Sequence, residues 1–260
     1  MHWILQNNIF SETGWDTLLA TLQRFGITHS THKVVPFVGE LEPAPQLGHK
    51  NVICFGSYSM RHVAKRESWT PGVFDLFEQD FQRQMKHWGA HMLNAGSVVT
   101  TFADAQFTDD EMFVRPVNDS KYFAGRVFQR EEFVEWQEKV CKLELVDGSS
   151  LTPQTLVQLA QPIVIHAEYR FWVVKGEVVT SSLYKRGDRV IYSSEVDERL
   201  AQYVRERIAE WMPLDSFVID VCDTAQGMRI VEINTLNAAG FYAADVQRLV
   251  VALEDAYSIL

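Results

Sequence analysis

Apolar residues recur at helical spacing in some segments and as short continuous runs in others, and the two patterns alternate over the first hundred residues. The short runs predict strands at residues 2–6, 33–37 and 51–55. Helical spacing predicts two amphipathic helices, one at Trp15, Leu18, Leu19, Leu22 and Phe25 and one over residues 74–93. Such alternation is typical of a small α/β unit, which residues 97–102 are expected to close.

Strands dominate after about residue 105. The pattern predicts strands at residues 112–117, 163–165, 168–174, 177–183, 189–192, 216–221 and 229–233, and helices that begin near residues 131, 196 and 246. Lys175 and Gly176 stand between two β-branched runs and predict a two-residue hairpin turn. Strand runs with segregated helices indicate α+β. We therefore expect an N-terminal α/β domain over residues 1–108 and an α+β domain over residues 109–260.

Composition and charge exclude several classes of protein. Hydrophobic residues make up 47% of the chain and charged residues 22%, as in an ordinary globular protein. The formal net charge of −10 leaves no chain-wide basic field, so neither nucleic acid nor a membrane is expected as a partner. No uncharged apolar stretch approaches 18 residues, and the first ten residues are too polar for a signal peptide. Three cysteines without a C-x-x-C pair fit reduced, buried thiols, and together these features predict a cytoplasmic protein.

Two acidic residues lie on the polar faces of neighbouring predicted strands near the end of the chain. Side chains alternate along a strand, so Asp220 lies opposite the apolar face made by Phe217, Ile219 and Val221. In the next strand Val231 and Ile233 share the apolar face and leave Glu232 and Asn234 on the polar one. A hairpin would bring Asp220 near Glu232, and adjacent carboxylates repel unless a cation lies between them. Oxygen donors of this kind suit Mg²⁺, although a solvated polar face is the alternative.

Two other segments concentrate basic residues. Arg115, Lys121 and Arg126 follow a predicted strand into a polar loop with one glycine, where they could bind a phosphate or simply lie on a surface hairpin. Farther along the chain, Glu168 and Arg170 share a strand face with Trp172. Charged residues are rarely buried without a partner, so this face is either a functional site or solvated.

Taken together, these segments resemble the ATP-grasp superfamily, and most closely its clade named for two conserved arginines and a lysine. The resemblance covers roughly residues 110–245, in family order. The matching text is Val114-Arg-Pro, Lys121-Tyr-Phe-Ala-Gly125, Glu168-Tyr-Arg-Phe-Trp-Val-Val-Lys-Gly176, Asp220, Val231-Glu-Ile-Asn234 and Ala239-Gly-Phe-Tyr242. The phosphate loop departs from many family members, because Gly125 is its single glycine. The resemblance implies an ATP-grasp fold preceded by a small α/β domain, with ATP between two α+β subdomains.

The same resemblance implies roles for the basic segments. Arg115 and Lys121 would contact the phosphates of ATP, and Arg170 would face the γ-phosphate or a phosphorylated intermediate. The hinge would lie at residues 163–167, where the backbone of Ile165, His166 and Ala167 would read the adenine. Glu168 would meet the ribose or the adenine amino group.

The resemblance also implies a metal site and an acceptor site. Asp220, Glu232 and Asn234 would hold Mg²⁺. A loop near the acceptor would contain Asn237, Gly240, Phe241 and Tyr242. Independently of the resemblance, Tyr58 and Arg61 follow the strand at residues 51–55, where an α/β unit often presents a ligand-binding loop, so they are also candidates for substrate contact.

In this family a carboxylate attacks the γ-phosphate of ATP, and a nucleophile then displaces phosphate from the acyl phosphate. The resemblance therefore predicts an ATP- and Mg²⁺-dependent ligase that joins a small-molecule or peptide carboxylate to an amine or thiol. A phosphotransferase on the same scaffold and a nucleotide-binding interaction module without turnover are the alternatives. The sequence makes no prediction of the oligomeric state.

Overall fold

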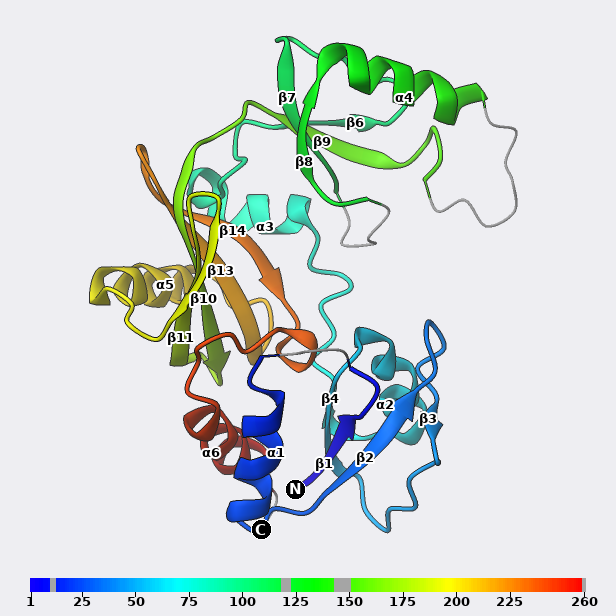
Figure 1. The fold of residues 1–260 in the computed structure, drawn as a ribbon, viewed down its shortest axis with the longest axis vertical. Helices are drawn as coiled ribbons and strands as arrows, with labels where there is room; N and C mark the ends of the chain where they lie inside the picture. The colour runs from blue at the N-terminus through cyan, green and yellow to red at the C-terminus, as the bar shows by residue number, and fades with distance from the viewer. Residues whose placement is uncertain (10–12, 118–122, 143–150, 259–260) are drawn as a thin grey trace. The chain divides into compact units, whose positions relative to one another are not determined.

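The computed structural model describes residues 1–9, 13–117, 123–142 and 151–258. The contacts divide the chain into two compact units, one made of residues 1–76 and 165–260 and the other of residues 77–164. Three β-sheets account for the strands of the two units (Figure 1). The expected domain boundary after residue 108 falls inside the second unit.

The first sheet of unit one is formed by the N-terminal residues. It contains β1 (His2–Gln6), β2 (His29–Val34), β3 (Leu41–Glu42), β4 (Asn51–Phe55) and β5 (Thr70–Gly72), in the order β3-β2-β1-β4-β5. Only β3 is antiparallel to its neighbour. Trp3 and Leu5 pack in one core cluster with α1 (Trp15–Arg24) and α6 (Val246–Tyr257), whereas Ile4 packs with α2 (Arg61–Glu67) in another. The sheet is therefore covered on both faces, as parallel sheets usually are.

The second sheet of unit one is antiparallel. Its strands are β10 (Ile165–Val174), β11 (Glu177–Arg186), β12 (Arg189–Ser193), β13 (Ser216–Thr224) and β14 (Gly227–Asn234), in the order β12-β11-β10-β13-β14. Lys175 and Gly176 have φ of 50° and 81°, which confirms the predicted hairpin turn. Phe217, Ile219 and Val221 are fully buried on one face, and α5 (Glu198–Glu210) packs against β11 and β13.

The opposite face of this sheet joins the core of the N-terminal sheet. Trp172 of β10 and Val218 of β13 belong to the same buried cluster as Trp3 and Leu5. The helix α6 packs against α1 from the N-terminal part of the chain, and the two lie side by side in Figure 1. Residues 1–76 and the C-terminal half are therefore one folded body.

Unit two is a four-stranded antiparallel sheet with helices. It contains β6 (Val98–Thr101), β7 (Glu111–Pro116), β8 (Arg126–Gln129) and β9 (Leu156–Ala160), in the order β6-β9-β7-β8, together with α3 (Phe81–Trp88) and α4 (Arg130–Lys142). Its core includes Phe102, Val114, Phe133 and Val157. No helix in the described ranges is long and apolar enough to cross a bilayer.

Four predicted elements differ from the structure. Residues 97–102 do not close the N-terminal unit, because β6 pairs with β9 in unit two. The predicted strand at residues 33–37 ends at Val34, and Phe37 has a left-handed φ of 63° in the following turn. The predicted strand at 163–165 is also wrong, since β10 begins at Ile165 and Val164 is 75% exposed.

The fourth difference is the long helix predicted over residues 74–93. Within that stretch only α3 and the short 3₁₀ turn that follows it, Gly89–His91, are helical. The helix α3 begins after Asp80, whose side chain accepts a hydrogen bond from the Arg83 N–H. The cysteines also differ in part, since Cys54 and Cys222 are buried but Cys141 is exposed.

Candidate functional site

The two acidic residues singled out in the sequence lie opposite each other on β13 and β14. The register pairs Asp220 with Glu232, which confirms the predicted juxtaposition. An irregularity between Asp220 and Val221 shifts the register beyond this pair, so Ile230 rather than Val231 is the fully buried residue of β14. Because the irregularity lies beyond this pair, Asp220 and Glu232 remain direct cross-strand neighbours.

A buried arginine pairs with one of these carboxylates. Arg170 of β10 is the cross-strand neighbour of Asp220 on the other side of β13. Its Nε donates to Asp220 Oδ1 at 2.8 Å and its Nη2 donates to Oδ2 at 2.7 Å. The two residues are 8% and 1% exposed, so the ion pair is both bidentate and shielded from water. This contact excludes the alternative of a solvated face at Arg170.

Asn234 links the two carboxylates. Its Nδ2 donates to Asp220 Oδ2 and to Glu232 Oε1, each at 3.2 Å. Burial raises the pKa of Asp220 to about 6, Arg170 opposes that shift, and the charges of Glu232 and Glu168 add to it. A cation that approached Asp220 closely would therefore stabilise the ionised form of its carboxyl group.

The donor set fits Mg²⁺ by its chemistry. Asp220 and Glu232 offer carboxylate oxygens and Asn234 an amide oxygen, which are the hard donors that Mg²⁺ prefers. A carboxylate has about four lone-pair sites, and Asp220 uses three of them for Arg170 and Asn234. Asn234 directs its NH₂ group at the two carboxylates, so its side-chain amide would have to flip for Oδ1 to ligate a metal. Within the described ranges, no group of three or more His, Cys, Asp or Glu side chains is arranged to hold a metal ion.

Glu168 lies on β10 two residues before Arg170 and is 9% exposed. Its carboxylate accepts hydrogen bonds from Tyr184 Oη at 2.8 Å and from Lys185 Nζ at 2.9 Å. Burial raises the pKa of Tyr184, so this tyrosine is a neutral donor. Glu168 is therefore a buried carboxylate with two partners from β11, and solvation does not explain it.

The predicted hinge residues occupy the first positions of β10. Ala167 is buried, whereas the side chain of His166 is exposed. The carbonyl oxygen of His166 accepts a hydrogen bond from the Gly187 N–H at 2.8 Å. This bond occupies one lone pair of a backbone group that was expected to bind adenine. The chain passes from unit two to unit one between Val164 and Ile165, within the segment predicted as the hinge.

Asn237 is not arranged as a substrate contact, although the sequence suggests one. It is 3% exposed, its Nδ2 donates to the carbonyls of Cys54 at 2.6 Å and Gly72 at 3.3 Å, and its Oδ1 accepts from the Phe74 N–H at 2.7 Å. Its own carbonyl accepts from the Gly56 N–H at 2.9 Å. Asn237 therefore fastens the segment after β14 to the carboxyl ends of β4 and β5.

Of the other residues expected in the same loop, Phe241 is buried in the hydrophobic core, whereas Gly240 and Tyr242 lie beside Arg170. The carbonyl of Gly240 accepts from Arg170 Nη1 at 3.4 Å, and the ring centroid of Tyr242 is 4.9 Å from Arg170 Cζ. Two tyrosines that the sequence analysis missed, Tyr184 and Tyr192, stack on Tyr242. Tyr184 occurs next to Lys185 in a polar strand, and the placement of both rings depends on strand order, which the sequence pattern does not give.

Tyr58 and Arg61 form a local pair after β4. The guanidinium carbon of Arg61 lies 4.3 Å from the Tyr58 ring centroid, and Arg61 Nη1 donates to the Tyr58 carbonyl at 3.2 Å. Tyr58 Oη donates to Asp75, and burial raises the pKa of this tyrosine. Both residues follow the carboxyl end of a parallel strand, next to the β-strand ends that Asn237 ties together.

Two further residues, Arg115 and Lys121, are predicted to contact phosphates. Arg115 lies on β7 opposite Gln158 of β9, and Lys121 lies outside the described residues. A Cβ at Gly125 would come within 2.8 Å of Arg115 Cβ, so glycine is needed for the chain to return beside Arg115.

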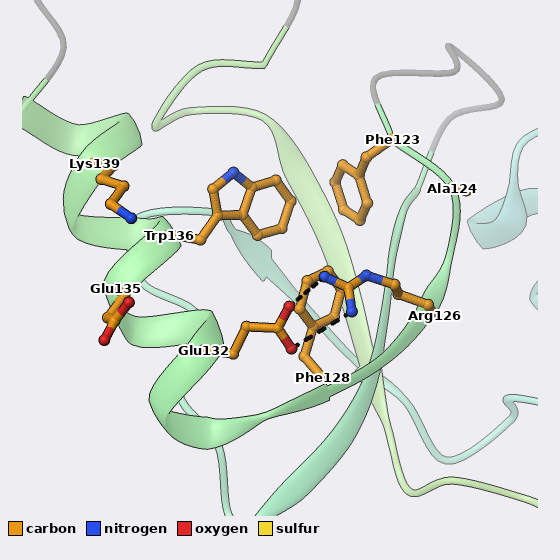
Figure 2. Close-up of a pocket in the computed structure, with 8 residues that line it drawn as sticks. All are labelled: Phe123, Ala124, Arg126, Phe128, Glu132, Glu135, Trp136 and Lys139. Carbon is orange, nitrogen blue, oxygen red and sulfur yellow. Dashed lines mark hydrogen bonds and ion pairs between the residues drawn. The ribbon is translucent and has the colours of Figure 1, made fainter.

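Arg126 does not present an unpaired cation. It pairs with Glu132 and lies 3.9 Å from the Phe128 ring centroid, at the edge of a pocket of about 450 Å³ (Figure 2). The remaining lining residues come from α4 and the segment before β8 and are Phe123, Ala124, Glu135, Trp136 and Lys139.

The comparison with family models decides the family. Residues 59–253 match the model of an ATP-grasp domain, family 3 of the clade named for two arginines and a lysine. The chain belongs to the ATP-grasp superfamily, in that clade. The match includes residues of both units and every predicted ATP, metal and acceptor residue except Tyr58, so the fold class expected from the sequence is confirmed.

Solved ATP-grasp structures share the fold over their whole length. A RimK domain ATP-grasp protein from Sphaerobacter thermophilus DSM 20745 is 14% identical at a TM-score of 0.65, with 99% of each chain covered. D-alanine–D-alanine ligase from Bacillus anthracis, complexed with ATP, is 12% identical at 0.64, covering 98% of this chain and 96% of that one. D-cycloserine synthetase DcsG is 13% identical at 0.61, covering 98% and 99%. No curated protein has a detectable sequence match to the chain.

Proposed function

We propose that this ATP-grasp protein is an ATP- and Mg²⁺-dependent ligase that joins a carboxylate to an amine or thiol through an acyl phosphate. The observation that carries the proposal is the connected set of buried Arg170 and Asp220 with half-buried Glu232 and Asn234, in which carboxylates are paired across strands and one of them binds a guanidinium. Family membership supports ATP as the nucleotide. Ligases among the similar structures support the reaction class.

Arg170 is suited to hold a phosphoryl group. Its guanidinium has five N–H donors, and the hydrogen bonds to Asp220 and Gly240 use three of them. The bidentate pair fixes the plane of the group, because both Nε and Nη2 are held by one carboxylate. A fixed cation with unused donors stabilises developing phosphoryl charge without reorganising at the moment of reaction.

The acidic residues would contribute by holding the metal. Mg²⁺ bound by Asp220, Glu232 and Asn234 would neutralise charge on the triphosphate. Asp220 has Arg170 on one side and Glu232 on the other, so the register of three strands sets the spacing between the cationic and the acidic parts of the site. In the same proposal Arg115 and Lys121 bind phosphates, and Ile165, His166, Ala167 and Glu168 bind the nucleoside.

The reaction requires no side-chain nucleophile. A carboxylate oxygen of the acceptor bonds to the γ-phosphorus as the bond from that phosphorus to ADP breaks. The amine or thiol then bonds to the acyl carbon, the bond from carbon to the phosphate oxygen breaks, and the nucleophile loses its proton. Binding and orienting both substrates is therefore the main contribution of the protein.

The experiment that tests this function measures three products together. Purified protein is incubated with Mg²⁺, ATP, a panel of carboxylic acids and hydroxylamine as a surrogate nucleophile. A ligase yields ADP, phosphate and a hydroxamate in equal amounts. ADP with a phosphorylated acceptor and no hydroxamate would indicate a phosphotransferase, and no turnover with any acid would contradict the proposal.

A further inference from the structure

Three tyrosine rings from three parts of the chain form one stack beside the ion pair. Tyr242 lies between Tyr184 of β11 and Tyr192 of β12. The ring centroids are 5.1 Å apart for Tyr184 and Tyr242 and 5.0 Å for Tyr192 and Tyr242, with interplanar angles of 24° and 26°. These values describe offset parallel stacking, which is a preferred arrangement of aromatic pairs.

Two hydrogen bonds from β11 hold the backbone that directly follows Tyr242. Ser182 Oγ accepts from the Ala243 N–H at 3.1 Å, and Thr180 Oγ1 accepts from the Asp245 N–H at 2.8 Å. Tyr242 itself has a left-handed φ of 52°, which a tyrosine adopts only where its surroundings require it. The segment is thus fastened to the sheet on its C-terminal side, and its ring is fixed between two others.

The two ends of the stack have different surroundings. At the inner end Arg170 Cζ lies 5.6 Å from the Tyr184 centroid and 4.9 Å from the Tyr242 centroid. At the outer end Tyr192 is 45% exposed, on the edge strand β12. The stack therefore extends from beside Arg170 to an exposed aromatic ring on the edge strand.

We propose, resting on the function proposed above, that Tyr192 forms the platform for a planar aromatic group of the carboxylate acceptor. An aromatic ring on Tyr192 would extend the stack by one member, whereas an aliphatic group would gain only buried area. Under the proposed function the acceptor carries a carboxylate, and the Arg170 guanidinium keeps two N–H donors beyond the three that bind Asp220 and Gly240. The acceptor class is thus an aromatic carboxylic acid or a chain that carries an aromatic side chain near its carboxylate.

Calorimetry with two matched acids tests this platform. Binding of 3-phenylpropanoate and of 3-cyclohexylpropanoate is measured in the presence of Mg²⁺ and ADP, because the two acids differ in flatness and aromaticity but not in length. We expect the wild type to bind the phenyl acid about threefold to tenfold more tightly. Tyr192→Ala should abolish that ratio, and Tyr192→Phe should keep it.

A control on the same strand separates this role from a general effect on β12. Ile191 is the immediate neighbour of Tyr192 on β12 and is 41% exposed, but it contributes no aromatic ring to the stack, so Ile191→Ala should keep the wild-type ratio. Equal affinities for the two acids in the wild type, equal loss of the ratio in Tyr192→Ala and Ile191→Ala, or no binding of either acid up to its solubility limit would each overturn the proposal. Phosphate release with the same acids is read separately, so a protein that binds the phenyl acid without turnover would contradict the ligase function and not the platform.

Discussion

Arg170 and Asp220 face each other across β10 and β13 and form two hydrogen bonds of 2.8 and 2.7 Å while 8% and 1% exposed. A charge pair this deeply buried is costly to separate, since removal of one member leaves the other uncompensated. The pair also connects the metal-binding candidates to the phosphate-binding one. Its disruption should therefore affect both stability and chemistry.

The energetic coupling of this pair can be measured with a double-mutant cycle. Arg170→Met alone should lower the free energy of unfolding by about 3–5 kcal/mol, because Asp220 then keeps a buried carboxylate without its cation. In the Arg170→Met background, Asp220→Asn should cost much less than it does alone. Urea unfolding of the four proteins gives the coupling energy, and additive effects would contradict a direct interaction.

A second prediction concerns the buried amide that ties the two sheets of unit one together. Asn237→Ala should lower the free energy of unfolding by about 2–3 kcal/mol, since it leaves the Phe74 N–H and the Cys54 carbonyl without their partner. Asn237→Asp keeps the shape but directs an acceptor at two carbonyl oxygens, and it should be at least as destabilising as alanine. Wild-type stability of Asn237→Asp, measured by thermal and urea unfolding, would contradict this role.

Acid pH should weaken the N-terminal sheet through His2. Burial, together with repulsion from His49, His29 and His32, lowers the pKa of His2 below its ordinary value of 6.5. The unfolded chain therefore binds a proton at a higher pH than the folded one, so stability falls as the pH drops below about 6.5. Urea unfolding at neutral and mildly acidic pH should show a smaller loss in His2→Gln than in the wild type.

The control for this pH effect is His166→Gln, because His166 is exposed on a different sheet. That variant should lose as much stability on acidification as the wild type does. An unchanged pH dependence in His2→Gln would show that His2 is not a source of the acid sensitivity. Ser30 Oγ contacts His2 Nε2 at 2.8 Å, and glutamine is chosen because it can keep such a hydrogen bond.

The acidic half of the site could be predicted from the sequence because strand alternation and a short turn determine it. Phe217, Ile219 and Val221 must face the core, which leaves Asp220 on the other face, and the hairpin brings Glu232 opposite. The partner of Asp220 was not predictable in this way. β11, β12 and α5 lie between Arg170 and Asp220 in sequence, so their pairing depends on a strand order that periodicity does not encode.

The wrong predictions share a physical cause, which is that tertiary contacts override local pattern. Aromatic residues at helical spacing predict a helix from residue 74, but the Phe74 N–H bonds to Asn237 and its carbonyl accepts from Thr235 Oγ1. The resemblance places Asn237 near the acceptor, in the loop that follows Asn234. Asn237 is instead buried, and its side chain donates to backbone carbonyls of the N-terminal sheet that lie more than 160 residues earlier in the chain.

The proposed function depends on the binding of the metal ion of Mg·ATP by Asp220 and Glu232. Its most direct test is calorimetric titration of Mg²⁺ with a non-hydrolysable ATP analogue into the wild type, Glu232→Gln and the control Asp223→Asn, which changes a half-buried carboxylate of the same sheet. We expect Glu232→Gln to bind at least about tenfold more weakly while the control binds like the wild type, consistent with the loss of a charged ligand. Wild-type affinity in Glu232→Gln would contradict the metal assignment.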